Sequence, residues 1–151
     1  IDWGEHQERE IAYVLELLDL FGLREETLID QYPIEFMPAM YAASEIVVYP
    51  SIYAEPFGIT ILEAMASAKP IIVTRSGGMP EIIRHNVNGL IVNPSDYRTL
   101  ANNIIRLFKY PDFAHEIGAR GREIFQRSYY LERMVDQTIS VYQRAIKNKQ
   151  S

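Results

Sequence analysis

The chain has 151 residues, of which 48% are hydrophobic and 11% aromatic, so it is long enough for one domain with a substantial core and too short for two. Its formal net charge of −5 argues against nucleic acid as a partner. The absence of cysteine excludes disulfides and thiolate metal sites within the chain and is compatible with a reducing cytoplasm.

Apolar patterns in chain order predict alternating helices and strands, which is typical of a parallel α/β sheet. The first half predicts a helix over about 8–21 that ends at Gly22, a strand at 28–30, a short helix at 37–43 and a strand at 46–49. The second half predicts strands at 71–74 and 90–93, and helices at about 59–67, 96–108 (capped by Ser95), 113–125 and 131–147. No apolar stretch approaches the ~18 residues of a membrane span, and no signal-like N-terminus is present.

Two carboxylates, Glu55 and Glu63, stand eight positions apart around a Pro/Gly turn that opens the 59–67 helix. Gly58 is expected to be the last non-helical residue, so the amides of Gly58, Ile59 and Thr60 lie at the positive end of the helix dipole without partners inside the helix. Such a terminus can bind a diphosphate without a lysine. Glu55 can then accept hydrogen bonds from sugar hydroxyls, and Glu63 from a ribose diol. The same two carboxylates also fit an ordinary loop and a solvated helix surface.

A second glycine-containing loop follows the strand at 71–74. Gly77 and Gly78 allow close approach of the backbone to a ligand, but a tight turn between strand and helix would need them as well. Pro80 is suited to the first turn of the next helix, and Glu81 favours the start of that helix whether or not a ligand is present. Arg75 can face either a phosphate or solvent.

The motif around Glu55 and Glu63 resembles the E-x7-E signature of retaining, nucleotide-sugar-dependent glycosyltransferases of the GT-B fold. The resemblance continues through 69–83, with its GG-x-x-E loop, and through 88–96, and it covers about 28–142. It is specific to this superfamily and leaves the donor and the acceptor open.

The resemblance implies an α/β fold with a Rossmann-like parallel sheet flanked by helices, the C-terminal half of a GT-B fold. It assigns Glu55, the expected catalytic residue, to positioning the hydroxyls of the donor sugar. The expected donor-binding groups are the backbone amides of Phe57, Gly58 and Ile59 at the sugar and diphosphate, Thr60 at a phosphate, Glu63 at the ribose, and the glycines Gly77 and Gly78.

The implied activity is transfer of a hexose from a UDP-, GDP- or ADP-sugar to a hydroxyl of a glycan, a lipid or a small sugar. In the front-face mechanism of such enzymes the leaving diphosphate helps to deprotonate the acceptor, and no residue is a nucleophile. The alternatives are a nucleotide-sugar epimerase of the same fold, against which the E-x7-E spacing argues, and a non-catalytic nucleotide-sugar-binding module.

No cofactor and no metal are expected, because the chain has no Asp-x-Asp pair or similar carboxylate cluster. The histidines are expected to be surface or packing residues and not ligands: His6, His85 and His115.

Two departures from the family pattern affect the expected architecture. Ala68 stands where the family usually has glycine, which puts the usual cap at the end of the motif helix in doubt. No strand-helix-strand unit with a basic pair and no acceptor domain precede Ile1, so residues 1–151 are expected to be the C-terminal nucleotide-sugar-binding domain of a longer enzyme. The expected protein partner is the missing N-terminal half, onto which part of the last helix would pack. A cytoplasmic location is expected, with peripheral contact at the inner face of the membrane through that missing half.

Overall fold

A computed structural model describes residues 4–149 of the chain. They fall into two compact units, of which the first ends at Ile34 and the second begins at Glu35. Each unit is described by itself.

The first unit consists mainly of helix α1 (Gly4–Phe21), which begins four residues earlier than predicted. It ends as the sequence predicted, because Gly22 adopts a left-handed backbone with φ 66°. The strand predicted over 28–30 is wrong: this segment is irregular, and Leu28 is 76% exposed. A strand needs a neighbour for its N–H and C=O groups, and the described part of this unit contains no other strand.

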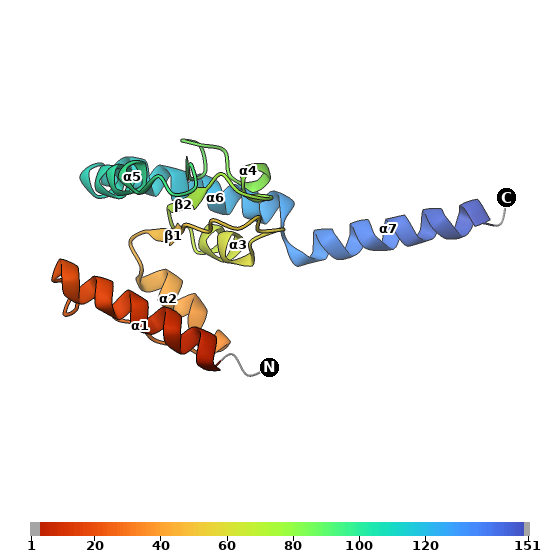
Figure 1. The fold of residues 1–151 in the computed structure, drawn as a ribbon. Coiled ribbons are helices and arrows are strands. Elements are labelled where there is room, and N and C mark those ends of the chain that lie inside the picture. The colour runs from red at the N-terminus through yellow and green to blue at the C-terminus, as the bar shows by residue number, and fades with distance from the viewer. Residues whose placement is uncertain (1–3, 150–151) are drawn as a thin grey trace. The chain divides into compact units, whose positions relative to one another are not determined.

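The second unit is built on a three-stranded parallel sheet in the order β1 (Val47–Tyr49), β2 (Ile71–Thr74) and β3 (Leu90–Val92). Helix α3 (Ile59–Ala66) connects β1 to β2, and the short helix α4 (Met79–Ile82) connects β2 to β3 (Figure 1). The parallel sheet and its three strands confirm the predicted fold class.

Helices cover both faces of this sheet. On β2, Ile71 and Val73 belong to one core cluster and Ile72 to another, as expected for side chains that alternate across a strand. The first cluster contains residues of α2 (Met37–Ala43), α3 and α4, and the second contains residues of α5 (Tyr97–Lys109) and α6 (Pro111–Ser128). The C-terminal part of α6 also packs against the first cluster. Because β2 and β3 are buried on both faces, their sequences are apolar except for Thr74 at the end of β2.

Helix α6 lies directly against the end of α3. A Cβ built on Gly118 would come within 2.3 Å of the Ala68 carbonyl oxygen, so only glycine permits this approach. The end of α3 also corrects an expectation from the sequence, because Ala68 does adopt a left-handed backbone, with φ 55°. Its N–H bonds to the Met65 carbonyl and the Lys69 N–H bonds to the Ala64 carbonyl, both at 3.0 Å, which is a complete Schellman cap.

The start of α5 corrects the predicted cap. Asp96, and not Ser95, is the N-cap, and its Oδ1 accepts a hydrogen bond from the Thr99 N–H at 3.0 Å. This bond lowers the pKa of the Asp96 carboxyl. Ser95 takes up a left-handed turn with φ 62°. The first residue of α6 is a proline, which suits a helix start and explains why the helix begins before the predicted position.

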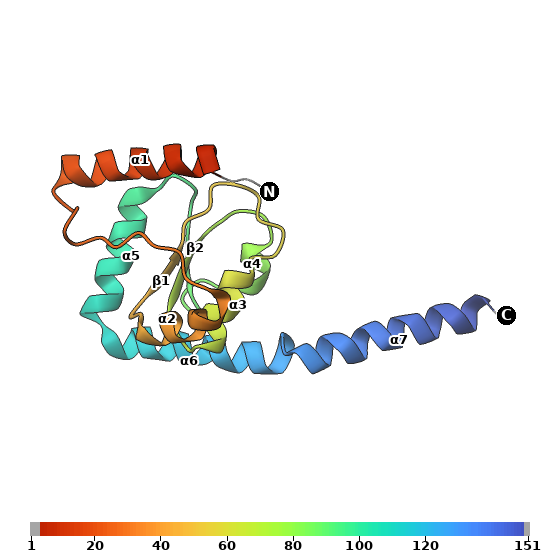
Figure 2. The same ribbon diagram turned by 90° about the horizontal axis from the view of Figure 1, so that it is seen from below.

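The remaining elements are the 3-10 helix η1 (Ile34–Phe36), which leads into α2, and the last helix α7 (Leu131–Lys149). Helix α7 continues beyond α6 (Figure 2), and none of its described residues is buried. Its large apolar side chains are exposed: Leu131, Met134, Val135, Ile139, Val141, Tyr142 and Ile146.

Candidate active site

The turn between β1 and α3 has the backbone that the sequence predicted. Gly58 is the N-cap of α3, with φ 75° and ψ 72°, and the cap has no side-chain hydrogen bond. A Cβ at this position would meet Ile61 Cδ1 at 2.9 Å, so both the conformation and the space favour glycine. The first turn closes with a hydrogen bond from the Ile61 N–H to the Gly58 carbonyl at 3.0 Å. The amides of Ile59 and Thr60 precede that bond at the positive end of the helix.

Glu55 lies in the loop before this turn and is half-buried. Its Oε2 accepts a hydrogen bond from the Tyr49 hydroxyl at 3.0 Å. Tyr49 is the last residue of β1, so the end of a sheet strand orients the carboxylate. Burial, and then the Glu55 carboxylate, raise the pKa of the Tyr49 hydroxyl, which therefore remains a donor at neutral pH.

Glu63 lies in α3 and is also half-buried. Its Oε2 accepts a hydrogen bond from the Tyr41 hydroxyl of α2 at 2.9 Å. Burial is the largest cause that raises the pKa of Tyr41 to about 12, followed by the hydrogen bond and the charge of Glu63, while a hydrogen bond with Thr60 acts in the opposite direction. Both carboxylates of the motif are thus held by tyrosines.

The loop that carries Glu55 is bound to the loop that follows β2. The Thr74 hydroxyl donates to the Ser51 carbonyl, the Ser76 hydroxyl donates to the Tyr53 carbonyl at 2.6 Å, and the Gly78 N–H donates to the Glu55 carbonyl at 2.9 Å. These bonds connect the carboxyl ends of two neighbouring parallel strands. They fix the backbone of Glu55 from outside its own loop.

Gly77 and Gly78 serve this contact between the loops. A Cβ on Gly77 would lie 2.1 Å from the Glu55 carbonyl oxygen, and one on Gly78 would lie 2.6 Å from the Pro56 oxygen. The close approach that the sequence suggested for these glycines is therefore an approach to the chain's own backbone. Their assignment to donor binding stays a prediction.

Phe57 and Ile59 flank Gly58 with exposed side chains. The Phe57 ring meets the ring of Tyr129, which follows α6, edge to face at a centroid distance of 6.5 Å. Ile59 is 69% exposed, so what this residue offers at the helix start is its backbone amide. Along the chain, Glu55 and Gly58 thus precede the first turn of α3, Thr60 lies in that turn and Glu63 lies one turn later, while their roles in donor binding stay a prediction.

Comparison with known proteins identifies the family. A family model described as glycosyl transferases group 1 matches residues 13–124. The chain belongs to this family.

A relative that is itself a glycosyltransferase agrees with this assignment. The chain is 36% identical over 107 residues to an uncharacterized glycosyltransferase of Methanocaldococcus jannaschii, a match that covers 71% of this chain and 27% of that protein. The chain therefore spans about a quarter of the length of this relative.

Solved structures confirm the GT-B fold. A sucrose-phosphate synthase from Thermosynechococcus elongatus superimposes with a TM-score of 0.85 at 31% identity, covering 93% of this chain and 35% of that one. Anabaena Alr3699/HepE in complex with UDP-glucose gives a TM-score of 0.84 at 25% identity, covering 92% and 38%.

Sequence reasoning missed four residues that hold this candidate site together. Tyr41 and Tyr49 look like ordinary core aromatics in a helix and a strand, and Thr74 and Ser76 look like the polar end of a strand. The signal that could have found Tyr49 is its position directly before the motif loop. Tyr41 offers no such signal, because its partner is 22 positions away.

The imidazoles and carboxylates of the described residues form no metal site. Among these residues, no group of three or more His, Cys, Asp or Glu side chains is placed to hold a metal ion. His85 is exposed, and its Nδ1 accepts a hydrogen bond from the Ile91 N–H at 2.9 Å. His115 is exposed, and the side chain of His6 lies outside the described residues. No helix within 4–149 has the length and apolar composition needed to cross a bilayer.

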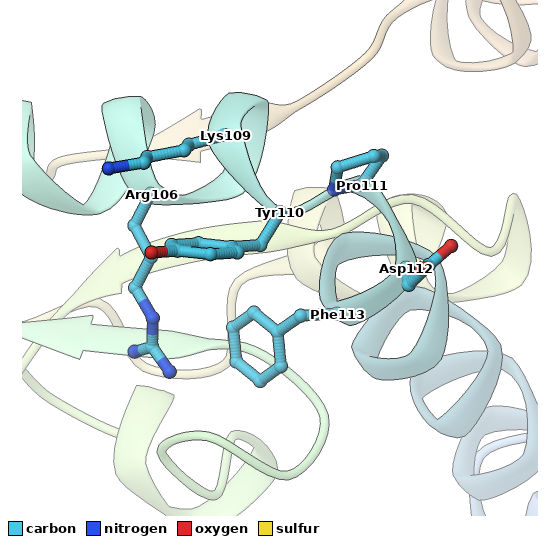
Figure 3. A pocket seen from close by; sticks show the side chains of 6 residues that line it. All are labelled: Arg106, Lys109, Tyr110, Pro111, Asp112 and Phe113. Carbon is cyan, nitrogen blue, oxygen red and sulfur yellow. The ribbon is translucent and has the colours of Figure 1, made fainter.

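A cavity of about 530 Å³ lies at the junction of α5 and α6 (Figure 3). The Arg106 guanidinium lies 4.3 Å from the centre of the Phe113 ring and donates to Asn86 Oδ1 at 2.8 Å. No residue of the motif lines this cavity, whose walls are Arg106, Lys109, Tyr110, Pro111, Asp112 and Phe113. We therefore place the candidate active site at the start of α3 and not in this cavity.

Proposed function

We propose that the chain is the donor-binding domain of a retaining hexosyltransferase that uses a nucleotide-diphosphate sugar. The observation that carries the proposal is the N-terminus of α3, where Gly58 is the N-cap and no side chain caps the helix, together with two tyrosine-bonded carboxylates, Glu55 before the cap and Glu63 one turn into the helix. The presence of UDP-glucose in the related Anabaena structure supports a ligand of this class.

In the proposed complex the amides of the first turn of α3 receive the diphosphate. Glu63 accepts hydrogen bonds from the ribose hydroxyls, and Glu55 accepts them from hydroxyls of the sugar. Preorganised amides would stabilise the charge that develops on the leaving diphosphate, which in turn takes the proton of the acceptor hydroxyl. The acceptor would come from a part of the enzyme outside this chain. Neither a nucleophilic side chain nor a metal is required for this arrangement.

Calorimetric titration of the chain with UDP, GDP and ADP tests the donor site. We expect Glu63→Ala to weaken the best of the three by about tenfold or more, because it removes a charge-assisted hydrogen bond of roughly 1.5–3 kcal/mol. Glu55→Ala should leave the free diphosphate unaffected and weaken only the nucleotide sugar. Glu45→Ala, an exposed carboxylate before β1, is the control and should change neither. Wild-type affinity for the diphosphate in both motif variants would contradict the assignment.

Turnover by the full-length protein tests the reaction. A panel of UDP-, GDP- and ADP-sugars with a hydroxyl acceptor should yield a glycoside that keeps the anomeric configuration of the donor. Activity should survive EDTA, because helix amides and not a cation are proposed to neutralise the diphosphate. Formation of the epimeric nucleotide sugar without an acceptor, or binding without turnover, would contradict the transferase. A loss in EDTA that Mg²⁺ or Mn²⁺ restores would contradict the metal-independent mechanism.

A further inference from the structure

Two tyrosine hydroxyls contact the two motif carboxylates, one each. Tyr49 donates to Glu55 at 3.0 Å and Tyr41 donates to Glu63 at 2.9 Å. In each pair the phenol bonds to Oε2 of the glutamate. A carboxylate has acceptor sites on both oxygens, so each glutamate keeps one oxygen that its tyrosine does not use.

The tyrosines belong to the hydrophobic core or pack against it, whereas the glutamates do not. Tyr41 is 8% exposed and belongs to the core cluster between the sheet, α3 and α4, and Tyr49 packs against the same cluster. Helix α2, which carries Tyr41, packs against α3, which carries Glu63 (Figure 1). A half-buried glutamate has several rotatable bonds and gains a fixed direction only from a partner. Packing in the core thus fixes each tyrosine, and the tyrosine hydroxyl in turn orients the carboxylate.

Both phenols remain protonated in the neutral range, because burial and the adjacent carboxylates raise their pKa values, to about 12 for Tyr41. Each phenol therefore donates its O–H to the adjacent glutamate carboxylate.

From this geometry we infer that Tyr41 and Tyr49 are positioning residues that set the ligand selectivity of the site: Tyr41 orients Glu63 toward the ribose diol, and Tyr49 orients Glu55 toward the sugar hydroxyls. The inference rests on the proposed function. It adds that the two recognition events are supported by separate tyrosines, from α2 and from β1. Removing the hydroxyl of one tyrosine should therefore impair recognition of either the ribose or the sugar and leave the other unchanged.

Paired ligands test the role of Tyr41. In calorimetry we expect Tyr41→Phe to weaken UDP, GDP or ADP by about tenfold, the effect of one misdirected hydrogen bond to a charged group, and to weaken the 2′-deoxy analogue much less. A merely structural defect would weaken both equally. In a Glu63→Ala background Tyr41→Phe should have no further effect, because the tyrosine acts through that carboxylate.

The counterpart for Tyr49 uses the nucleotide sugar. Tyr49→Phe should leave the free diphosphate at wild-type affinity, weaken the nucleotide sugar by about tenfold, and lower turnover by the full-length protein. Tyr97→Phe, at a 72% exposed position at the start of α5, is the matched control and should change none of these quantities. Circular dichroism melts of all variants verify folding.

The outcomes separate the inference from the function on which it rests. If the wild-type chain binds no nucleoside diphosphate, the proposed function and this assignment both fail. If the wild type binds and the two phenylalanine variants bind all ligands equally well, or lose ribose and deoxyribose ligands to the same extent, only the assignment to the tyrosines is overturned.

Discussion

Helices α3 and α5 lie in the same unit, and both follow a strand of the same sheet. They differ in whether charged side chains stand at their ends. Helix α5 has its own carboxylate, Asp96, at the N-cap and two basic residues in its last turn, so its dipole is compensated at both ends. Helix α3 has no side-chain cap, no acidic residue in its first turn and no basic residue in its last. Gly58, the N-cap of α3, and Ala68, which follows its C-cap, both adopt a left-handed backbone.

Under the proposed function, this difference distinguishes a helix with a structural role, α5, from a helix that binds a ligand, α3. In α5 the anion that a helix N-terminus attracts is part of the chain. In α3 the corresponding position is open and flanked by oriented carboxylates, which supports the proposal that the anion comes with the ligand. Four substitutions probe this contrast, in decreasing order of the change that each should produce.

Gly77→Ala should disrupt the open terminus most strongly. The new Cβ would lie 2.1 Å from the Glu55 carbonyl oxygen, so the two loops must separate, and we expect a loss of about 1–3 kcal/mol in the free energy of unfolding. Nucleotide-sugar binding should fall with it. The matched control is Gly22→Ala, because Gly22 has a similar φ of 66° but no atom within 4 Å of the position that a Cβ would take, so it bears only the backbone penalty. Equal losses in thermal melts of the two variants would contradict the role of the loop contact.

Ile59→Asp should give α3 the charge that α5 already has. At this exposed first position an aspartate favours the helix dipole, so stability should stay the same or rise by about 0.3–1 kcal/mol. Binding of a nucleoside diphosphate should weaken by about tenfold, because the new carboxylate repels it. Ile59→Asn, which is similar in size but uncharged, is the control. Unchanged calorimetric affinity in the aspartate variant would mean that the diphosphate does not bind at this terminus.

Ala68→Gly addresses the other end of α3. Glycine adopts φ 55° without the steric penalty of a Cβ, so the free energy of unfolding should rise by about 1 kcal/mol after the greater freedom of glycine in the unfolded chain is taken into account. Ala119→Gly, at an exposed position within α6, should lower it by about 1 kcal/mol instead. Denaturant titrations that show the same sign for both variants would refute the strain at Ala68.

Asp96→Ala should lower the melting temperature through α5 and leave nucleotide affinity unchanged. The folded chain lowers the pKa of Asp96, so its contribution to stability is present above the pKa of the unfolded chain and is lost as the pH falls through the folded value. The difference in melting temperature between wild type and variant should therefore shrink in acid. Asp96→Asn, which can still cap the helix, should retain most of the stability and lose this pH dependence. A change in nucleotide binding in the alanine variant would contradict the separation of the two helices.

Much of the fold follows from local pattern. The runs that form β1, β2 and β3 can be predicted because strands of a parallel sheet are rich in β-branched and apolar residues. The place of Gly58 can be predicted because few other residues suit the turn it makes. The strand expected at 28–30 does not form because strand formation depends on a neighbour, which no local pattern reveals. The predicted cap of α5 falls one residue too early, since Ser95 and Asp96 are both good cap residues.

The acidic residues of the candidate site can be predicted from the sequence, whereas the residues that hydrogen-bond to them and to their loop cannot. Glu55 and Glu63 are evident from their spacing around the turn. Tyr41 bonds to a partner 22 positions away in the sequence, and Thr74 to one 23 positions away. These hydrogen bonds form only after the sheet and helices have assembled. The left-handed backbone of Ala68 is unexpected for a similar reason, because the geometry of the α3 terminus overrides the preference of alanine.

The bonds from Thr74, Ser76 and Gly78 to the loop that carries Glu55 constrain how this site can be engineered. Exchanging the 50–58 segment between members of the family would transplant the carboxylate without the partner that determines where its backbone lies. A chimera that exchanges residues 50–58 and 74–78 together keeps both halves of the contact. The two loops, although distant in sequence, must therefore be exchanged together. Recombination that separates them should produce folded proteins with poorly aligned carboxylates.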